Sequence, residues 1–255
     1  MSNDTVRSHW LLAPACASDA SLPVPLGDVT ALLEQVGRSS GSSDEVAGQL
    51  LHLLGRHVPL AQCTIFSFQG RSRPRIVGFG DRARTGALPL ISQDYSERFY
   101  PLDGAQRVMQ AELARQQRNP QAPARVWLHR QKPSDVSHPE YRRVCYDLPR
   151  LVERLSLLTL QTGARWLAVN LYRGEEHGGF DPQSIARIEA FAPLVMQAMR
   201  LHYAGQALQD DLALLSERAE RFGLDLSRPT SLLLMETHRP DAGYLVRRLR
   251  ATHVL

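Results

Sequence analysis

The residues best suited to metal chemistry in this chain are three histidines and a cysteine. His129, His138, His177 and Cys145 are common metal ligands, but their spacing matches no metal-ligand motif. The chain also contains no nucleophile-elbow, phosphate-loop or His-Glu-x-x-His sequence. We therefore expect no metal site, no cofactor, no catalytic residues and no enzyme activity.

Cys145 lies beside two basic residues in a predicted helix. Arg142 and Arg143 are near enough along that helix to lower the pKa of the thiol, as a redox sensor requires. The alternative is an inert cysteine buried against the core. Together with Cys16 and Cys63 the chain has three cysteines and no Cys-x-x-Cys pair, which argues against a disulfide framework and favours a reducing, cytoplasmic environment.

A set of aromatic residues with few polar neighbours is the candidate for a ligand pocket. Small-molecule cavities are commonly lined by aromatic rings and a small number of polar groups. The predicted pocket residues are Phe66, Tyr95, Phe99, Tyr141, Cys145, Trp166 and Asn170. The same residues would equally form an aromatic core without a cavity, and the sequence leaves both interpretations open.

Segments with strand-like alternation must position these residues. Residues 63–68 and 75–79 predict one hairpin, and residues 154–160 and 166–172 predict a second around Gln-Thr-Gly-Ala. Residues 125–129 predict a further short strand. Because the hairpins pair antiparallel strands, we expect an antiparallel sheet.

The last predicted strand has two different faces. Alternation places Trp166, Ala168, Asn170 and Tyr172 on one face and Leu167, Val169 and Leu171 on the other. Long helices suit the aliphatic face, whereas a smaller layer with a cavity suits the aromatic and polar face. Gly78-Phe-Gly80 and Gly178-Gly179 are predicted as turns.

Helical periodicity predicts the helices that cover the sheet. Residues 26–36 and 44–54 predict two short helices, and residues 92–114 and 139–148 predict helical segments. Asp181 is placed as an N-cap with a proline after it, opening a helix whose apolar stripe is Ile185, Ile188, Phe191, Ala192, Val195 and Met199.

That helix is followed by heptad spacing. The predicted dimerisation residues are Leu201, Leu208, Leu212, Leu215, Ala219 and Phe222, and the last five follow the 4-3-4-3 spacing of a two-stranded coiled coil. We therefore predict a homodimer. The alternative is an amphipathic helix folded against its own domain.

The charge pattern gives little support for a nucleic-acid partner. The net charge is +4, its carriers are scattered, and Lys132 is the only lysine. In the final segment Arg247, Arg248 and Arg250 are candidate phosphate contacts, although basic ends of chains are commonly only solvated. No apolar run approaches the ~20 residues of a transmembrane helix, so we expect no membrane span.

Several segments together resemble the sensor half of LuxR-type transcriptional regulators with a GAF-like domain. They are Tyr141-Arg-Arg-Val-Cys-Tyr-Asp-Leu-Pro149, Glu153-Arg-Leu-Ser-Leu-Leu158, Trp166-Leu-Ala-Val-Asn-Leu-Tyr-Arg173 and Ala192-Pro-Leu-Val195 before His202. The resemblance covers about residues 25–222. It implies an α+β, GAF/PAS-like fold, an antiparallel sheet of about five to six strands flanked by helices, in a cytoplasmic bacterial regulator.

In that family a DNA-binding helix-turn-helix normally follows the sensor. Leu214-Leu-Ser-Glu-Arg218 resembles the opening of such an output domain, and the similarity then stops. We expect a lead over residues 1–24, a sensor domain over 25–203, a connector helix over 204–223 and a divergent basic tail over 224–255. The predicted role is a regulatory sensor that binds a small molecule or a partner and signals through a dimerising helix. The alternatives are a DNA-binding regulator with a divergent C-terminal reader and, after it, a small-molecule enzyme on the same scaffold.

Overall fold

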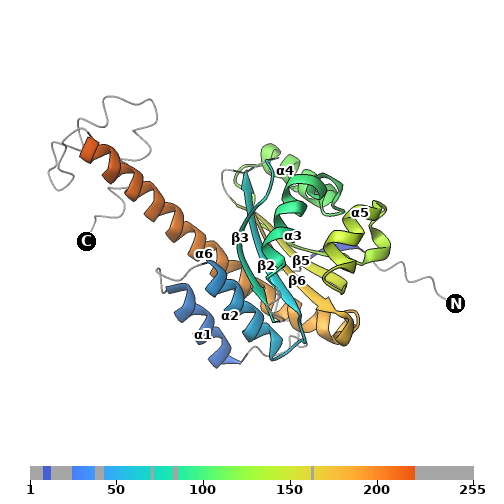
Figure 1. Cartoon of the computed structure of the whole chain (residues 1–255). Helices are drawn as coiled ribbons and strands as arrows, with labels where there is room; N and C mark the ends of the chain where they lie inside the picture. The colour runs from blue at the N-terminus through green and yellow to red at the C-terminus, as the bar shows by residue number, and fades with distance from the viewer. Residues whose placement is uncertain are drawn as a thin grey trace. The chain divides into compact units, whose positions relative to one another are not determined.

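A six-stranded antiparallel sheet forms the centre of the fold (Figure 1). The computed structural model describes residues 8–12, 25–37, 43–69, 72–82, 86–161 and 164–221. The chain divides into two units, residues 1–202 and 203–255, and the sheet belongs to the first. The strands, in their order across the sheet, are β1 (His9–Leu11), β4 (Val126–Gln131), β5 (Leu151–Gln161), β6 (Arg165–Gly174), β2 (Gln62–Gln69) and β3 (Arg75–Asp81).

All five predicted strands are present, and every neighbouring pair is antiparallel. The register confirms the predicted faces of the last strand. Trp166 pairs with Phe68 and Asn170 with Thr64, so the aromatic and polar residues of β2 and β6 share one face. The predicted α+β fold, with an antiparallel sheet of about five to six strands flanked by helices, is confirmed.

The sixth strand, β1, lies inside the segment predicted as a lead. His9 pairs with His129 of β4, and the Trp10 Nε1 donates a hydrogen bond to Glu189 Oε1 at 2.6 Å. Three residues are too few for alternation to predict a strand. The position of β1 depends instead on backbone pairing with β4 and on the contact between Trp10 and Glu189. The sheet therefore begins earlier in the chain than residue 25.

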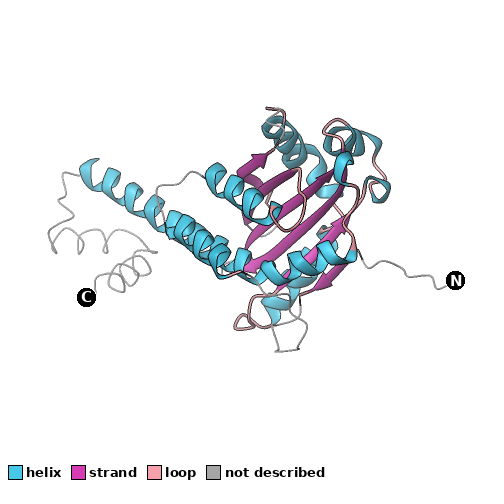
Figure 2. Ribbon diagram, turned by 90° about the horizontal axis from the view of Figure 1, so that it is seen from below, coloured by secondary structure: helices cyan, strands magenta, loops and turns pink. Residues whose placement is uncertain are grey.

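The aliphatic face of the sheet is covered by long helices, as expected (Figure 2). These are α1 (Leu26–Gly37), α2 (Ser43–Gly55) and the beginning of α6 (Pro182–Arg221). Gly80 is part of β3 and not a turn, which corrects the prediction for Gly78-Phe-Gly80. A Cβ at Gly80 would lie 3.0 Å from the Ala47 oxygen and 3.1 Å from the Gly48 Cα, so glycine is needed for α2 to approach β3.

Helix α6 begins at its predicted cap. The Ser184 amide donates a hydrogen bond to Asp181 Oδ1 at 2.7 Å, and Pro182 occupies the first helical position. Ile188, Phe191 and Val195 are buried, which confirms the predicted apolar stripe. None of the described helices combines the length and apolar character that crossing a membrane requires.

The opposite face carries a layer of helical segments, all but α4 shorter than α1 and α2. They are α3 (Leu88–Asp94), η1 (Tyr95–Phe99), η2 (Tyr100–Leu102), α4 (Gln106–Arg118), η3 (Pro133–Asp135), α5 (Pro139–Arg142), η4 (Arg143–Asp147) and η6 (Glu175–His177). Both predicted helical segments, 92–114 and 139–148, are helical but interrupted. The segments η1 and η4 are π-helical turns, a geometry that inserts one residue and is frequent at functional sites.

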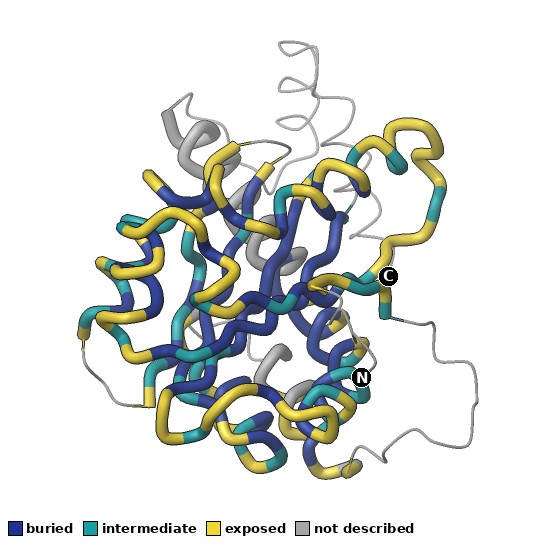
Figure 3. Tube along the Cα trace, turned by 90° about the vertical axis from the view of Figure 1, so that its right-hand side faces the viewer, coloured by how far each residue is buried: buried dark blue, intermediate teal, exposed yellow. Residues whose placement is uncertain are grey.

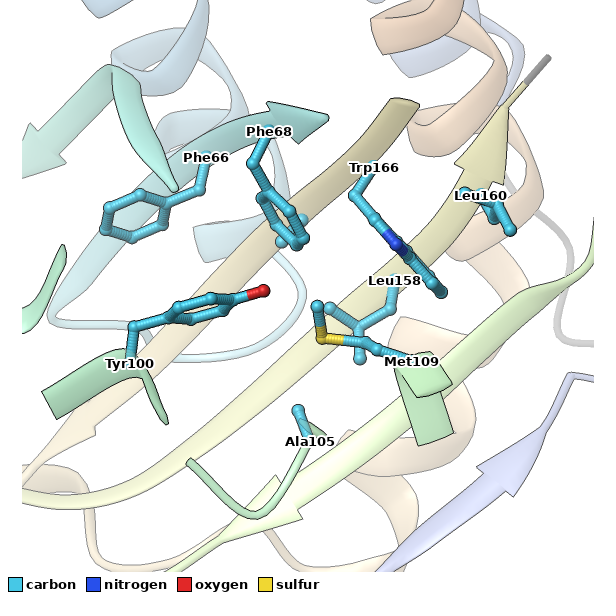
Figure 4. Close-up of a cluster of buried hydrophobic side chains, with 9 residues drawn as sticks. Phe66, Phe68, Tyr100, Ala105, Met109, Leu158, Leu160 and Trp166 are labelled. Carbon is cyan, nitrogen blue, oxygen red and sulfur yellow. The ribbon is translucent and has the colours of Figure 1, made fainter. Parts of the chain in front are cut away.

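Between this layer and the sheet lies a closely packed aromatic cluster (Figure 4). The rings of Phe68 and Trp166 are stacked with centroids 6.1 Å apart, and Tyr100 meets Phe68 edge-on at 5.4 Å. Met109 fills the remaining space beside Tyr100. The central strands are consequently buried on both faces, while exposed residues are concentrated in the surrounding segments (Figure 3).

Candidate functional site

A buried carboxylate organises the space next to the aromatic cluster. Asp103 follows the turn η2, and its Oδ1 accepts a hydrogen bond from the Ala105 amide at 2.8 Å. Its Oδ2 accepts hydrogen bonds from the hydroxyls of Tyr95 and Tyr141, each at 2.9 Å. Arg154 Nη2 lies 2.7 Å from the same oxygen. Residues from two separate helical segments thus converge with one strand on a single carboxylate.

The ion pair keeps both of its members charged despite burial. Burial alone would raise the pKa of Asp103, but attraction to Arg154 and then to His129, with hydrogen bonds, outweighs it and lowers the pKa to about 2. Burial likewise disfavours the charged form of Arg154, yet Asp103 holds its pKa well above the ordinary value. At neutral pH the pair is fully ionised.

His129 extends this polar cluster along β4. Burial lowers the pKa of His129 to about 4, although the charge of Asp103 opposes the shift. Its Nε2 lies 3.9 Å from Asp103 Oδ1. Because the histidine is neutral at pH 7, Asp103, Arg154 and His129 together carry no net charge.

A second acceptor lies behind the carboxylate. Gln131 Oε1 accepts hydrogen bonds from the hydroxyl of Tyr141 at 3.1 Å and from that of Tyr146 at 2.7 Å. Burial raises the pKa of both tyrosines, so their hydroxyls remain protonated donors. The phenols are therefore held in place by Asp103 and Gln131. We call Asp103, His129, Gln131, Tyr95, Tyr141, Tyr146 and Arg154 the polar cluster.

Two small cavities adjoin the polar cluster, each with a volume of about 20 Å³. The inner cavity lies toward the aromatic cluster and is lined by Met109, Ser156 and Asn170, among others. The outer cavity is lined by Gln62, Cys145 and residues of the helical layer. Each volume is close to that of one water molecule.

The same three side chains separate the two cavities. Phe66, Tyr95 and Arg154 line both of them. Within the part of the chain that the structure describes, Arg154 Nε and Ser156 Oγ are buried without a hydrogen-bond partner, and so is Gln62 Oε1. Buried polar groups are normally satisfied, so these atoms indicate a place for water or a ligand.

The predicted pocket residues all lie on the aromatic and polar side of the sheet. Phe66 and Tyr95 line both cavities, Asn170 lines the inner cavity and Cys145 the outer one. Tyr141 belongs to the polar cluster through its hydroxyl. Phe99 and Trp166 line neither cavity: Phe99 stacks on the ring of Tyr141 at 5.3 Å, and Trp166 belongs to the aromatic cluster.

Sequence reasoning missed the charged centre of the site. Asp103, Arg154 and Gln131 were not among the predicted residues, and His129 was considered only as a metal ligand. One signal was present for Arg154: it alternates with Ser156 in a leucine-rich strand, and the two residues pair with Tyr172 and Asn170. Nothing comparable marks Asp103, because it lies in a loop whose position depends on the tertiary fold.

The tertiary structure bears on the redox role considered for Cys145 and on the metal binding considered for the histidines. Burial raises the pKa of the Cys145 thiol to about 12, which is the opposite of what a redox sensor needs. Among the residues described, no three or more His, Cys, Asp or Glu side chains are grouped to hold a metal ion.

Part of the predicted dimerisation seam can be placed. Leu201 is 52% exposed on α6, whose backbone is helical as far as Arg221. Phe222 and the arginines Arg247, Arg248 and Arg250 lie outside the described residues, as do the side chains of Leu208, Leu212, Leu215 and Ala219. The predictions for these residues stay predictions.

Comparison with known proteins gives structural matches only. No protein-family model matches the chain, and no curated protein matches it. The VqsR LBD domain from Pseudomonas aeruginosa is 19% identical, with a TM-score of 0.46 and coverage of 71% of this chain and 96% of that one. CepR2 from Burkholderia cenocepacia, an N-acylhomoserine-lactone-dependent LuxR-family transcription factor, is 11% identical, with a TM-score of 0.47 and coverage of 69% and 92%.

GAF domains are also among the similar structures. The GAF domain/HD domain protein from Geobacter sulfurreducens is 20% identical, with a TM-score of 0.40 and coverage of 69% of this chain and 98% of that one. Identities and TM-scores this low assign neither a ligand nor a role to this chain. Its function is therefore argued from its own residues.

Proposed function

We propose that this protein is a regulatory sensor of the LuxR-type regulator kind. Its GAF-like domain binds a small molecule at the polar cluster and signals through helix α6, which pairs with the same helix of a second copy. The observation that carries this proposal is the pair of cavities that Arg154 lines, each with a buried polar atom in its wall that has no hydrogen-bond partner among the described residues.

The polar cluster is better explained by binding than by stability. A buried ion pair costs several kcal/mol of desolvation for each ion, and apolar residues of similar volume often stabilise a fold as well or better. Arg154 and Asp103 are nevertheless placed where the aromatic cluster would otherwise continue across the sheet. Their position supports a role in recognising a ligand.

The charges of the cluster indicate the kind of molecule. Asp103 and Arg154 neutralise each other, and His129 is uncharged at neutral pH. An ionic ligand would leave one buried charge uncompensated, which is strongly unfavourable. We therefore expect an uncharged molecule that offers an acceptor to Arg154 Nε and a donor to Gln62 Oε1.

The present cavities are smaller than such a molecule, so binding requires the helical layer to move. Apart from the 13-residue α4, this layer is built from segments of three to seven residues with two π-helical turns, whereas the aliphatic face is held by α1, α2 and α6. Short segments open at lower free-energy cost than a packed core. A ligand that binds the open form better would shift the population toward it.

Transmission to a dimer is supported by the course of α6. Phe191, Val195 and Met199 are buried in the sheet domain, and the exposed Leu201 lies two residues beyond Met199 on the same helix. A change in the sheet domain would alter which residues of α6 are free to pair. The free, buried Cys63 and Cys145 are compatible with a reducing cytoplasmic compartment.

An enzyme is the second candidate, because Asp103, His129 and Tyr95 are titratable groups that converge. We nevertheless propose that no bond is made or broken. Asp103 is held ionised by Arg154, and both of its carboxylate oxygens already accept hydrogen bonds from the surrounding protein. A general acid or base needs contact with a reacting atom, and this arrangement offers none.

Native mass spectrometry of the purified full-length chain tests the proposal. We expect a dimer that carries an additional mass of a small molecule, released on denaturation. The Arg154→Met variant should lose that mass, whereas Arg118→Met, at an exposed position near the end of α4, should keep it. A chain without added mass, and without thermal stabilisation by any uncharged compound of a metabolite library, would contradict ligand binding.

A further inference from the structure

A long groove open to solvent lies above the outer cavity, with a volume of about 1260 Å³. It is lined by residues of α3, of the segment from Glu140 to Leu148 and of the turn η6, and by Arg150. Leu90 and Leu148, which are 69% and 60% exposed, contribute apolar surface to it. The proposed function does not use this groove.

The groove and the two cavities form a series. Gln62 and Ile91 line both the groove and the outer cavity. Phe66, Tyr95 and Arg154 line both the outer and the inner cavity. Among the described residues, Gln62 and Ile91 are the side chains common to the groove and the outer cavity, so the floor of the groove is also the outer wall of the proposed ligand site.

We propose that this groove is the mouth of the interior site, and that Ile91 and Gln62 form the gate between them. This inference rests on the proposed function, because a gate matters only if a molecule enters. Opening would move Ile91 outward with α3 and turn the Gln62 side chain along the groove, joining the groove to the outer cavity.

Three features make this wall the easiest to open. Helix α3 has seven residues, and its N-cap, Ala87, provides no side-chain hydrogen bond. The helix continues directly into the π-helical turn η1, which carries Tyr95. Gln62 Oε1 has no hydrogen-bond partner among the described residues, so its rotation breaks no such bond.

The chain contains its own reporter for opening. Cys145 lines the outer cavity and is buried behind the gate. Cys63 is also buried, but it lies on β2 with its side chain on the aliphatic face, under the long helices. Burial raises the pKa of both thiols to about 12, so the two cysteines are matched in intrinsic reactivity.

The experiment measures the rate at which each thiol reacts with a neutral alkylating reagent, iodoacetamide, in the full chain carrying Cys16→Ser. Peptide mass spectrometry separates Cys145 from Cys63. We expect Ile91→Ala and Gln62→Ala to accelerate Cys145 by about tenfold or more, because a smaller side chain reduces the free energy of local opening. Cys63 should keep its rate.

Leu90→Ala is the matched control, since Leu90 precedes Ile91 on the same helix but lines only the groove. It should leave Cys145 unchanged. If Ile91→Ala accelerates both cysteines alike, the milder Ile91→Val variant decides, because it retains most of the packing. Selective acceleration of Cys145 in Ile91→Val supports the gate, and an unchanged or parallel rate overturns it.

The assay needs no ligand, so it fails independently of the proposed function. If the chain retains a small molecule but the alkylation rate of Cys145 does not change in Ile91→Ala or Gln62→Ala, the entrance lies elsewhere and the proposed sensing function stands. If Cys145 is alkylated faster in these variants but the chain binds no small molecule, the gate is supported and the proposed sensing function is contradicted.

Discussion

Arg154 Nη2 lies 2.7 Å from Asp103 Oδ2, with side chains that are 4% and 1% exposed. The pair links a residue in the middle of the sheet to the loop that starts α4. Around it, Tyr95 and Tyr141 donate hydrogen bonds to the same carboxylate. This one contact therefore fixes the helical layer against the sheet and defines the proposed site.

Replacing one member of the Asp103–Arg154 pair should destabilise the folded protein. Asp103→Asn leaves Arg154 buried without a counter-charge, and we expect a loss of about 3 to 5 kcal/mol in the free energy of unfolding. Arg154→Met should cost a similar amount, and the double variant much less than the sum of the two. Urea denaturation measures all three, with Asp147→Asn at an exposed position as control.

A double variant whose loss equals that sum would show that the two side chains do not interact energetically. In that case the contact would not hold the helical layer to the sheet.

Stability should fall in mild acid because of His129. Its folded-state pKa is about 4 and its ordinary value 6.5, so between these values only the unfolded chain takes up the proton. The free energy of unfolding should thus decrease by about 3 kcal/mol as the pH falls from 6.5 to 4. Urea denaturation at a series of pH values measures this loss.

Replacement by glutamine separates this contribution from others. His129→Gln should flatten the pH dependence in that window, although His202, whose pKa burial also lowers, contributes to it. His52→Gln, at an exposed residue of α2, should not flatten it. An unchanged slope in His129→Gln would mean that this histidine titrates alike in both states.

Asp103 should cause a second loss of stability at lower pH. Its pKa is lowered from 3.8 to about 2, so it contributes stability above pH 3.8 that is lost as the pH falls toward 2. The expected loss is about 2 kcal/mol. Asp103→Asn should reduce the pH dependence in this range, to which Glu140 and Asp181, whose pKa values are also lowered, contribute. Persistence of the full slope in that variant would contradict the assignment.

Replacement by alanine should change the stability in opposite directions at two glycines that lie close together in space, one in β3 and one in α2. Gly80→Ala places a Cβ 3.0 Å from the Ala47 oxygen, so we expect a loss of about 1 to 3 kcal/mol. Gly48→Ala meets no atom within 4 Å inside α2, and it should stabilise by about 0.5 to 1 kcal/mol. Thermal or urea denaturation measures both, and equal effects would contradict the close approach of α2 to β3.

Pairing through α6 should depend on the heptad leucines. Leu208→Glu with Leu215→Glu puts two charges into the predicted seam, and we expect sedimentation equilibrium to report a monomer with an unchanged sheet domain. Gln209→Glu, one position along the helix, should remain dimeric. A wild-type chain that is already monomeric would contradict the dimer.

Local sequence signals predicted the strands and the principal helices well. Alternation in residues 166–172 fixed the two faces of β6, and the Asp181 cap with Pro182 fixed the beginning of α6. These signals succeed because each depends on neighbours within a few residues. The same signals could not predict β1, whose three residues are positioned by β4 and by Glu189 of α6.

The sequence by itself determined the alternating faces, the helix ends and the aromatic composition of the core. Tertiary structure alone decided that Asp103 meets Arg154 across 51 positions of sequence, that Gly80 lies under α2, and that burial shifts the pKa of His129 and Cys145. The reason is physical: periodicity and capping are local properties of the backbone, whereas burial, charge pairing and cavities arise only when distant segments share the same space.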